Sequence, residues 1–190
     1  MKALTVLPDG YREIYTVDLQ KNKKMALHVN LLAVVIAAAL VLPAAFSVPF
    51  AHLFDGERLV WPIVRLASIA VLAVLYMITH ELIHGAAMRL CGTKKVRYGF
   101  TGWYAFAGSD DYYAKGPYLF IALAPVVLVG VLLAVVNLLV PVSWFWVVYL
   151  IQIINLSGAA GDLFVTVRFL CLPKDILVRD WGVSMKVYAR

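Results

Sequence analysis

Two histidines and a glutamate lie close together in the segment His80-Glu81-Leu82-Ile83-His84. On a helix, residues four positions apart share one face, so His80 and His84 can bind a single metal ion. Zinc suits two neutral imidazoles, and a catalytic zinc site needs a third protein ligand and an open position for water. The metal lowers the pKa of that water toward neutrality, and Glu81 can take its proton and pass it to a leaving amine. The segment therefore predicts a catalytic zinc site with Glu81 as the general base.

These three ionisable residues stand in an apolar stretch of an unusually apolar chain. Of the 190 residues, 63% are hydrophobic and only 15% are charged, whereas roughly 45–50% of an average soluble protein is apolar. A soluble domain of this length buries only about two-thirds of its chain surface, so the lipid bilayer must act as part of the solvent. Ionisable groups inside an apolar span are costly and mark functional sites. The alternative, that these side chains face lipid headgroups, explains their position less well.

Four apolar runs predict four transmembrane helices, because each reaches the ~20 residues needed to cross a hydrocarbon core about 30 Å thick. The runs cover residues 26–50, 61–90, 117–140 and 143–172. We therefore predict an all-α polytopic membrane protein with one domain. Its four-helix membrane core (26–172) lies between a cytoplasmic N-terminal segment (1–25) and a cytoplasmic tail (173–190).

Three prolines lie within or near these runs, at Pro43, Pro49 and Pro125. We expect them to kink the helices. Membranes tolerate such kinks when neighbouring helices satisfy the carbonyl groups that the prolines free.

The basic residues are distributed unevenly along the chain. Of the 17 lysines and arginines, all except Arg58 and Arg65 lie before the first run, between the second and third runs, or at and after the end of the fourth. The positive-inside rule makes that side cytoplasmic, so both termini are expected inside the cell. The net charge of +6 then reports membrane topology, and we expect no nucleic-acid partner.

Two segments outside the predicted spans have the pattern of β-strands. Polar and apolar residues alternate over residues 11–19, as in a half-exposed strand. Residues 96–100 and 103–106 flank Thr101-Gly102, which predicts a hairpin with a glycine-containing turn. Aromatic residues also collect at the membrane interface, so an interfacial segment without strands is the alternative.

The third metal ligand is expected from another helix at the depth of His80, and Asp162 fits best. His80 is 19 residues after Trp61, and Asp162 is 19 residues after Ser143. Both distances correspond to ~28 Å of helix, measured from the outer end of spans that run in the same direction. The small residues 157–161 before Asp162 would allow helices to approach closely.

Other acidic and histidine residues compete less well for this role. His28 begins the first span on the correct side, and Asp110 and Asp111 lie in the loop between the second and third spans. Glu57 lies on the opposite side of the membrane. An ion pair between Asp162 and a nearby arginine, either Arg89 or Arg168, is the alternative to metal binding.

These features together resemble the site-2 protease type of intramembrane zinc metalloprotease. The closer resemblance is to the bacterial family named "putative zincin peptidase", and it covers nearly the whole chain. It is carried by residues 8–11 with the basic stretch 21–24, by residues 80–85, by Ala122-Leu123-Ala124-Pro125 and by residues 158–162. In site-2 proteases two histidines and an aspartate hold zinc and a glutamate is the base.

The resemblance implies these roles for His80, His84, Asp162 and Glu81. The aspartate of site-2 proteases stands in the stretch Asn-Leu-x-Pro-x-x-x-Asp-Gly. Residues 155–163 here, which begin with Asn155 and Leu156, lack its proline and its final glycine and depart from its spacing. A substrate or oxyanion contact for Asn155 is therefore a weaker inference, since an asparagine in a helix bundle more often bridges helices.

The leading functional hypothesis is an intramembrane zinc peptidase that cleaves a membrane-anchored peptide or protein near the cytoplasmic face of the bilayer. A cytoplasmic strand would bind the substrate by adding it as a further strand. The alternative is a non-catalytic pseudo-protease or metal-binding scaffold, and a transporter is a third reading, less favoured because paired half-helices are absent. The intact Glu81 favours catalysis, because a structural site needs ligands but no base.

Overall fold

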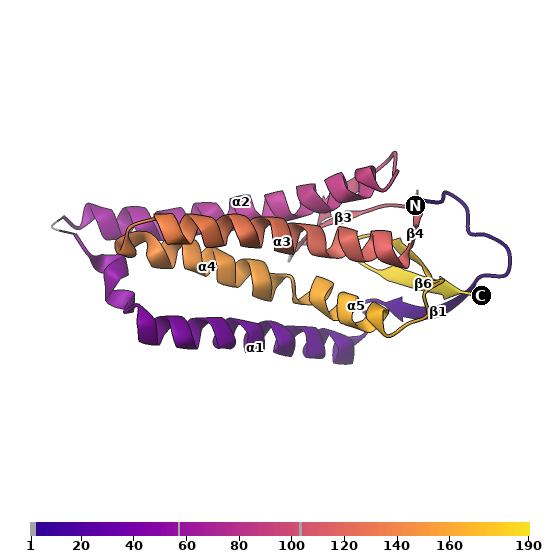
Figure 1. Cartoon of the computed structure of the whole chain (residues 1–190), viewed down its shortest axis with the longest axis horizontal. Coiled ribbons are helices and arrows are strands. Elements are labelled where there is room, and N and C mark those ends of the chain that lie inside the picture. Colours follow the sequence, from indigo (N-terminus) through magenta and orange to yellow (C-terminus); the bar gives the residue numbers. More distant parts are fainter. Residues whose placement is uncertain (1–2, 57, 103) are drawn as a thin grey trace. The chain divides into compact units, whose positions relative to one another are not determined.

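A computed structural model describes residues 3–56, 58–102 and 104–190 (Figure 1). Lys2, Glu57 and Trp103, which entered the sequence interpretation, lie outside the described residues. The helices are α1 (Lys23–Ser47), the 3-10 helix η1 (Phe50–Phe54), α2 (Val60–Leu90), α3 (Lys115–Leu139), α4 (Val142–Gly158) and α5 (Ala160–Leu170). The strands are β1 (Arg12–Val17), β2 (Arg97–Phe100), β3 (Ala105–Gly108), β4 (Tyr112–Ala114), β5 (Leu177–Asp180) and β6 (Met185–Ala189).

The helices match the four predicted apolar runs, with one difference in the last. Within the described residues, α1, α2 and α3 are each long and apolar enough to cross a membrane. The fourth run is divided at Ala159 into α4 and α5, which qualify only when the pair is counted as one span. The chain thus has three candidate spans, or up to four, and is a multi-pass membrane protein. Large apolar side chains on these helices are exposed, such as Phe46 at 91% and Leu138 at 85%.

The chain divides into two compact units, which we describe separately. The strand-bearing unit contains the chain up to Val29, Thr79–Pro125 and Gly161–Arg190. The helical unit contains Asn30–Ile78 and Val126–Ala160. Both α2 and α3 therefore contribute one end to each unit.

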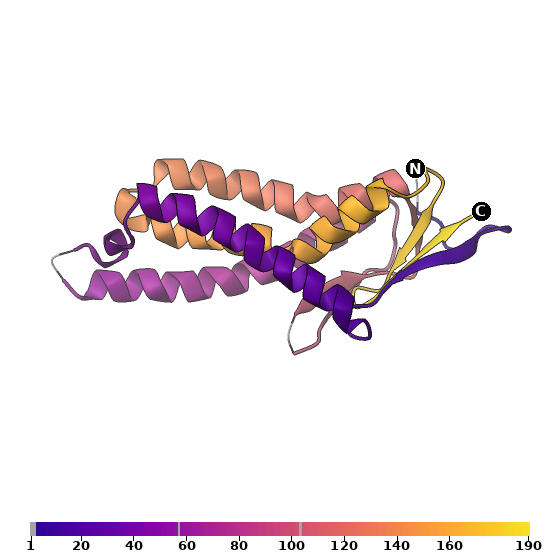
Figure 2. The same ribbon diagram turned by 90° about the horizontal axis from the view of Figure 1, so that it is seen from below.

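A four-stranded antiparallel sheet organises the strand-bearing unit, in the order β1-β6-β5-β4. In Figure 2 the indigo strand β1 and the yellow strands β5 and β6 lie side by side. Val178 of β5 and Val187 of β6 are fully buried and pack with the ends of α2, α3 and α5. The prediction of an all-α protein with only short strand segments is thus incomplete. Part of what was predicted as a tail after residue 172 forms two paired strands.

The strands that were predicted are confirmed. β1 lies within residues 11–19 and pairs with β6, with Arg12 opposite Ala189. β2 and β3 form a separate two-stranded hairpin in which Arg97 lies opposite Gly108. Gly102 has a φ of +92° in the connection, a backbone conformation that glycine adopts at little cost.

The helical unit is held together by aromatic and polar contacts between its own segments. Trp146 of α4 is fully buried, donates from Nε1 to the Val48 carbonyl at 3.0 Å and stacks on Phe50. Tyr149, one turn later in α4, donates to the Leu40 carbonyl of α1. These contacts connect α4 with α1 and η1.

Candidate metal centre

The predicted ligands lie together in the strand-bearing unit, where α2 meets α5. His80 and His84 occupy one face of α2 and are 7% and 9% exposed. Asp162 is in the first turn of α5, and 26% of its side chain is exposed. Among the described residues these three form a group whose potential ligand atoms all lie within 4.8 Å of one another. The four-residue spacing and the matched depth in two helices together account for this arrangement.

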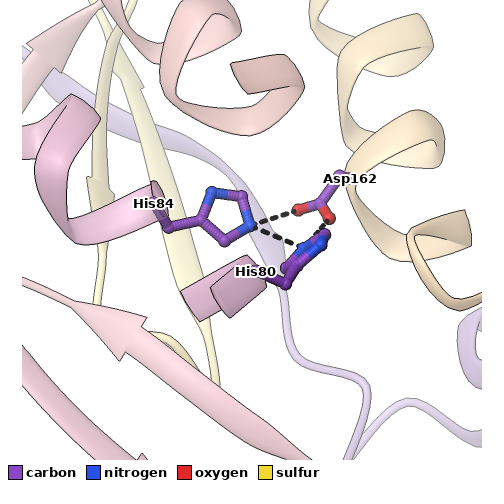
Figure 3. Close-up of side chains that lie close together, drawn as sticks. All are labelled: His80, His84 and Asp162. Atoms are coloured by element: carbon purple, nitrogen blue, oxygen red, sulfur yellow. Dashed lines mark hydrogen bonds and ion pairs between the residues drawn. The ribbon is translucent and has the colours of Figure 1, made fainter. Parts of the chain in front are cut away.

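The distances within the group fit a tetrahedral zinc ion. His80 Nε2 is 3.1 Å from His84 Nε2 and 3.3 Å from Asp162 Oδ2, and His84 Nε2 is 3.6 Å from Asp162 Oδ1 (Figure 3). With metal–ligand bonds of about 2.0–2.1 Å, two ligands of a tetrahedral zinc stand about 3.3 Å apart. The nearest atoms of each pair thus lie about as far apart as two zinc ligands, and Asp162 meets the two imidazoles through different oxygens. Two histidines and one carboxylate are also a ligand set of catalytic zinc sites, which leave the fourth corner open.

The second nitrogen of His84 has a defined partner. Its Nδ1 lies 2.9 Å from the backbone carbonyl oxygen of Ile121 in α3. Because a carbonyl oxygen only accepts hydrogen bonds, Nδ1 must carry the proton. Nε2 then presents its lone pair toward His80 and Asp162, which is the protonation state that a metal ligand requires.

Asp162 owes its place in α5 to the interruption of the fourth apolar run. α4 ends at Gly158 and a new helix begins at Ala160, which puts Asp162 in a first turn. Glycines disfavour a continuous helix, and the positive end of a helix dipole favours a carboxylate. The small-residue run was expected to permit close helix approach. A Cβ atom at Gly161 would meet nothing within 4 Å, so at this glycine the run serves the helix break instead.

Glu81 does not belong to the group of potential ligands. It is half-buried on α2, and the backbone of Ala107 in β3 lies near its carboxylate. The side chain is thus held beside the hairpin, one residue away from His80. This separation from the ligand group is consistent with a proton acceptor.

The competing ligands lie elsewhere in the described structure. His28 is exposed on α1, and Asp110 pairs with Arg97 and Arg179. Neither these residues nor Asp111 belongs to the His80, His84 and Asp162 group. Glu57 is not among the described residues.

The alternative of an arginine partner for Asp162 is not what the structure shows. Within the described residues, the ionisable side chains found next to the Asp162 carboxylate are His80 and His84. Arg168 lies over the ring of Tyr15 instead, 5.3 Å from its centre.

Gly85, directly after the second histidine, is in close contact with the hairpin. A Cβ atom at position 85 would overlap the hydroxyl group and ring of Tyr98 in β2. Glycine at this position therefore leaves room for the Tyr98 side chain beside the part of α2 that carries the site. The sequence interpretation used Gly85 only as part of a resemblance and did not connect it with Tyr98.

A buried acid supports the first turn of α3, and the sequence interpretation missed it. Asp180 of β5 accepts hydrogen bonds from the Tyr118 hydroxyl at 2.7 Å and from the Gly182 N–H at 2.7 Å. Burial raises the pKa of the Asp180 carboxyl above its ordinary value, although these donors act to lower it. Asp180 falls in a short strand without a motif, so no sequence signal identified it.

The fold and the site define a class: a multi-pass membrane protein with a buried histidine–histidine–aspartate group suited to zinc. A family model described as "Putative zincin peptidase" matches residues 72–177, which include His80, Glu81, His84 and Asp162. The chain belongs to this family, and the family's name assigns it to the zinc metallopeptidases. The comparison with curated proteins gives no match, and neither does the comparison with solved structures.

Proposed function

We propose that the protein is an intramembrane zinc metallopeptidase, similar to site-2 proteases, that hydrolyses peptide bonds of membrane-anchored substrates near the cytoplasmic face. The observation that carries this proposal is the geometry of the group. His80, His84 and Asp162 come from two helices, are largely buried, and are spaced like three ligands of a tetrahedral zinc. Membership in the zincin peptidase family supports the same conclusion.

The residues of the chain have distinct roles in the proposed reaction. His80, His84 and Asp162 would hold the metal, which when bound supplies a Lewis acid and acidifies water. Glu81 takes a proton from the attacking water as a carbon–oxygen bond forms at the peptide carbonyl. Glu81 then gives that proton to the leaving nitrogen as the carbon–nitrogen bond breaks. The backbone of Ala107 lies near the carboxylate of Glu81, so it would help to orient Glu81 between these two steps.

The hairpin β2–β3 is the proposed place for the substrate. Its two strands form their own sheet, and Ala107 of β3 contacts Glu81. A peptide that adds to a hairpin edge is extended, with its peptide bonds accessible. A membrane-anchored substrate must lose helical structure before cleavage, because a helix shields its peptide bonds. Pairing with the hairpin would stabilise the unwound segment.

We also propose that both termini and the metal site face the cytoplasm, because the basic residues gather at these parts of the chain. Reporter fusions at residues 100 and 190 should give cytoplasmic signals. Fusions after residues 57 and 142 should give signals from the opposite side. An external signal at residue 100 would reverse the orientation and place the site on the other face.

The decisive experiment for catalysis is the Glu81→Gln variant. Glutamine keeps the shape of the side chain but cannot accept the proton, so cleavage should fall by about 10²–10⁴-fold, the usual worth of general-base assistance. Zinc content should stay at the wild-type level. Membranes from cells that produce either form at equal amounts would be compared by mapping new peptide N-termini.

The matched control is Glu13→Gln, the same change at an exposed residue of β1. It should leave both zinc content and cleavage unchanged. If Glu81→Gln fully complements a deletion while His80→Ala does not, the metal is structural. The non-catalytic scaffold would then replace the peptidase.

A further inference from the structure

One backbone carbonyl of α3 forms its hydrogen bond outside its own helix. In an α-helix each carbonyl accepts from the N–H group four residues later. For Ile121 that residue is Pro125, which lies inside α3 and has no N–H group. The Ile121 oxygen accepts from Nδ1 of His84 on α2 at 2.9 Å instead.

This hydrogen bond is buried and determines which nitrogen of His84 is free. Ile121 is 2% exposed and His84 is 9% exposed, so water does not compete for either group. With the proton held on Nδ1, the lone pair of Nε2 faces His80 and Asp162. A partner of this kind fixes the orientation of a ligating imidazole and increases its basicity.

We propose that Pro125 is a positioning residue for His84. Because it lacks the amide that would otherwise engage the Ile121 carbonyl, that oxygen is available to orient the imidazole of His84. The inference rests on the proposed metal site, since it concerns one of its three ligands. It assigns a role in that site to a residue that is outside the group of potential ligands.

The first turn of α3 is fixed well enough to place this carbonyl. The Tyr118 hydroxyl donates to buried Asp180 at 2.7 Å. Lys115 Nζ donates to the carbonyl oxygens of Leu170, at the end of α5, and of Leu172, just after it, at 3.0 and 2.7 Å. Ile121 follows Tyr118 by less than one turn. Hydrogen bonds to β5 and to the end of α5 thus fix the first turn of α3, and with it the position of the Ile121 carbonyl.

The Pro125→Ala variant restores an N–H group that competes for the Ile121 oxygen. Loss of such a partner typically costs 10–100-fold in metal affinity, and we expect about a tenfold loss because the oxygen can accept two hydrogen bonds. Zinc affinity would be measured on the purified full-length protein in detergent, by competition with a chromophoric chelator. Pro43→Ala makes the same change inside α1, far along the chain from the site, and should leave the affinity unchanged.

A second measurement reads the tautomer of His84 directly. Nitrogen NMR of the metal-free protein labelled with [¹⁵N]histidine reports which nitrogen carries the proton, with His84 assigned from a His84→Gln variant. The wild-type protein should show one tautomer, protonated at Nδ1, and Pro125→Ala should show a mixture. Pro43→Ala should match the wild type.

The outcomes separate this inference from the proposed function. Wild-type affinity and an unchanged tautomer in Pro125→Ala would overturn the role of Pro125, and so would an equal loss in Pro43→Ala. If Pro125→Ala does not fold, a wild-type His84 protonated at Nε2 would still overturn it. If the wild-type protein binds no zinc but His84 is protonated at Nδ1, the metal site fails while the control of His84 by Ile121 stands.

Discussion

Buried polar side chains are bonded differently in the two units. In the helical unit, Arg65 is 5% exposed and donates to the backbone carbonyls of Leu53 and Asp55. Asn155, which is fully buried, donates to the carbonyl of Val126 at 3.1 Å. In both cases a side chain meets main-chain oxygens and thereby connects two segments of the unit.

In the strand-bearing unit, Asp180 bonds to the Tyr118 hydroxyl and the Gly182 N–H, but a second buried polar group consists of ionisable side chains that face one another. His80, His84 and Asp162 meet at 3.1–3.6 Å. Bonds to backbone carbonyls satisfy a buried donor and stabilise a fold. A convergence of two imidazoles and a carboxylate is also the arrangement that a bound zinc ion requires. The difference distinguishes structural polar groups from a proposed metal site in one apolar chain.

The largest expected effect comes from removing one of the converging side chains. His80→Ala and Asp162→Ala should each lose zinc, because two remaining protein ligands hold the ion poorly. Zinc content of the purified protein, measured by elemental analysis, tests this directly. Full zinc occupancy in Asp162→Ala would exclude Asp162 as a ligand and would direct attention to His28 and Asp111.

The matched change in the helical unit is Asn155→Leu, which removes a buried polar side chain of similar size. Asn155 Oδ1 has no hydrogen-bond partner among the described residues, so replacement by an apolar group should change the free energy of unfolding by less than about 1.5 kcal/mol. Zinc content should not change. A loss of zinc equal to that of Asp162→Ala would contradict the division between the two kinds of polar group. It would also revive the substrate-side role that the resemblance to site-2 proteases implied for Asn155.

Much of the proposed site can be predicted from the spacing and alternation of residues along the sequence. The four-residue spacing of His80 and His84 needs only a helix. Asp162 follows from counting residues along two spans that run in the same direction. The hairpin β2–β3 and strand β1 follow from alternation and a glycine turn, and the structure confirms both.

The parts that could not be predicted depend on contacts between distant residues. β5 and β6 are four and five residues long, too short for a periodic signal, and they form a sheet only with β1 and β4. The division of the fourth apolar run at Ala159 could not be predicted, because a run of small residues is typical both of a close contact between helices and of a break in a helix. The Ile121 carbonyl carries no side-chain signature at all. Pro125 was the one indication in the sequence, because a proline inside a helix leaves one carbonyl without its usual N–H donor. It does not indicate which residue donates to that carbonyl instead.

The smallest expected effect compares one glycine from each unit. Alanine normally stabilises a helix interior relative to glycine by roughly 0.5–1 kcal/mol. At Gly85 the added methyl group meets Tyr98, and overpacking of this kind costs typically 1–3 kcal/mol, so Gly85→Ala should reduce the free energy of unfolding by about 1 kcal/mol. At Gly130 the nearest atom is Asn155 Nδ2 at 3.2 Å, a side chain that can shift, so Gly130→Ala should be close to neutral.

The free energy of unfolding of both variants would be measured in detergent, by titration with a denaturing detergent. The double variant Gly85→Ala with Tyr98→Ala tests whether the contact with Tyr98 causes the loss of stability. If the Tyr98 ring is what the methyl group meets, removing it should restore the helix-stabilising effect of alanine. The coupling energy between the two positions should then exceed about 0.5 kcal/mol, the lower range for residues in contact. Additive effects would mean that Gly85 is required for another reason. The close approach of β2 to the helix that carries His80 and His84 would then not depend on this glycine.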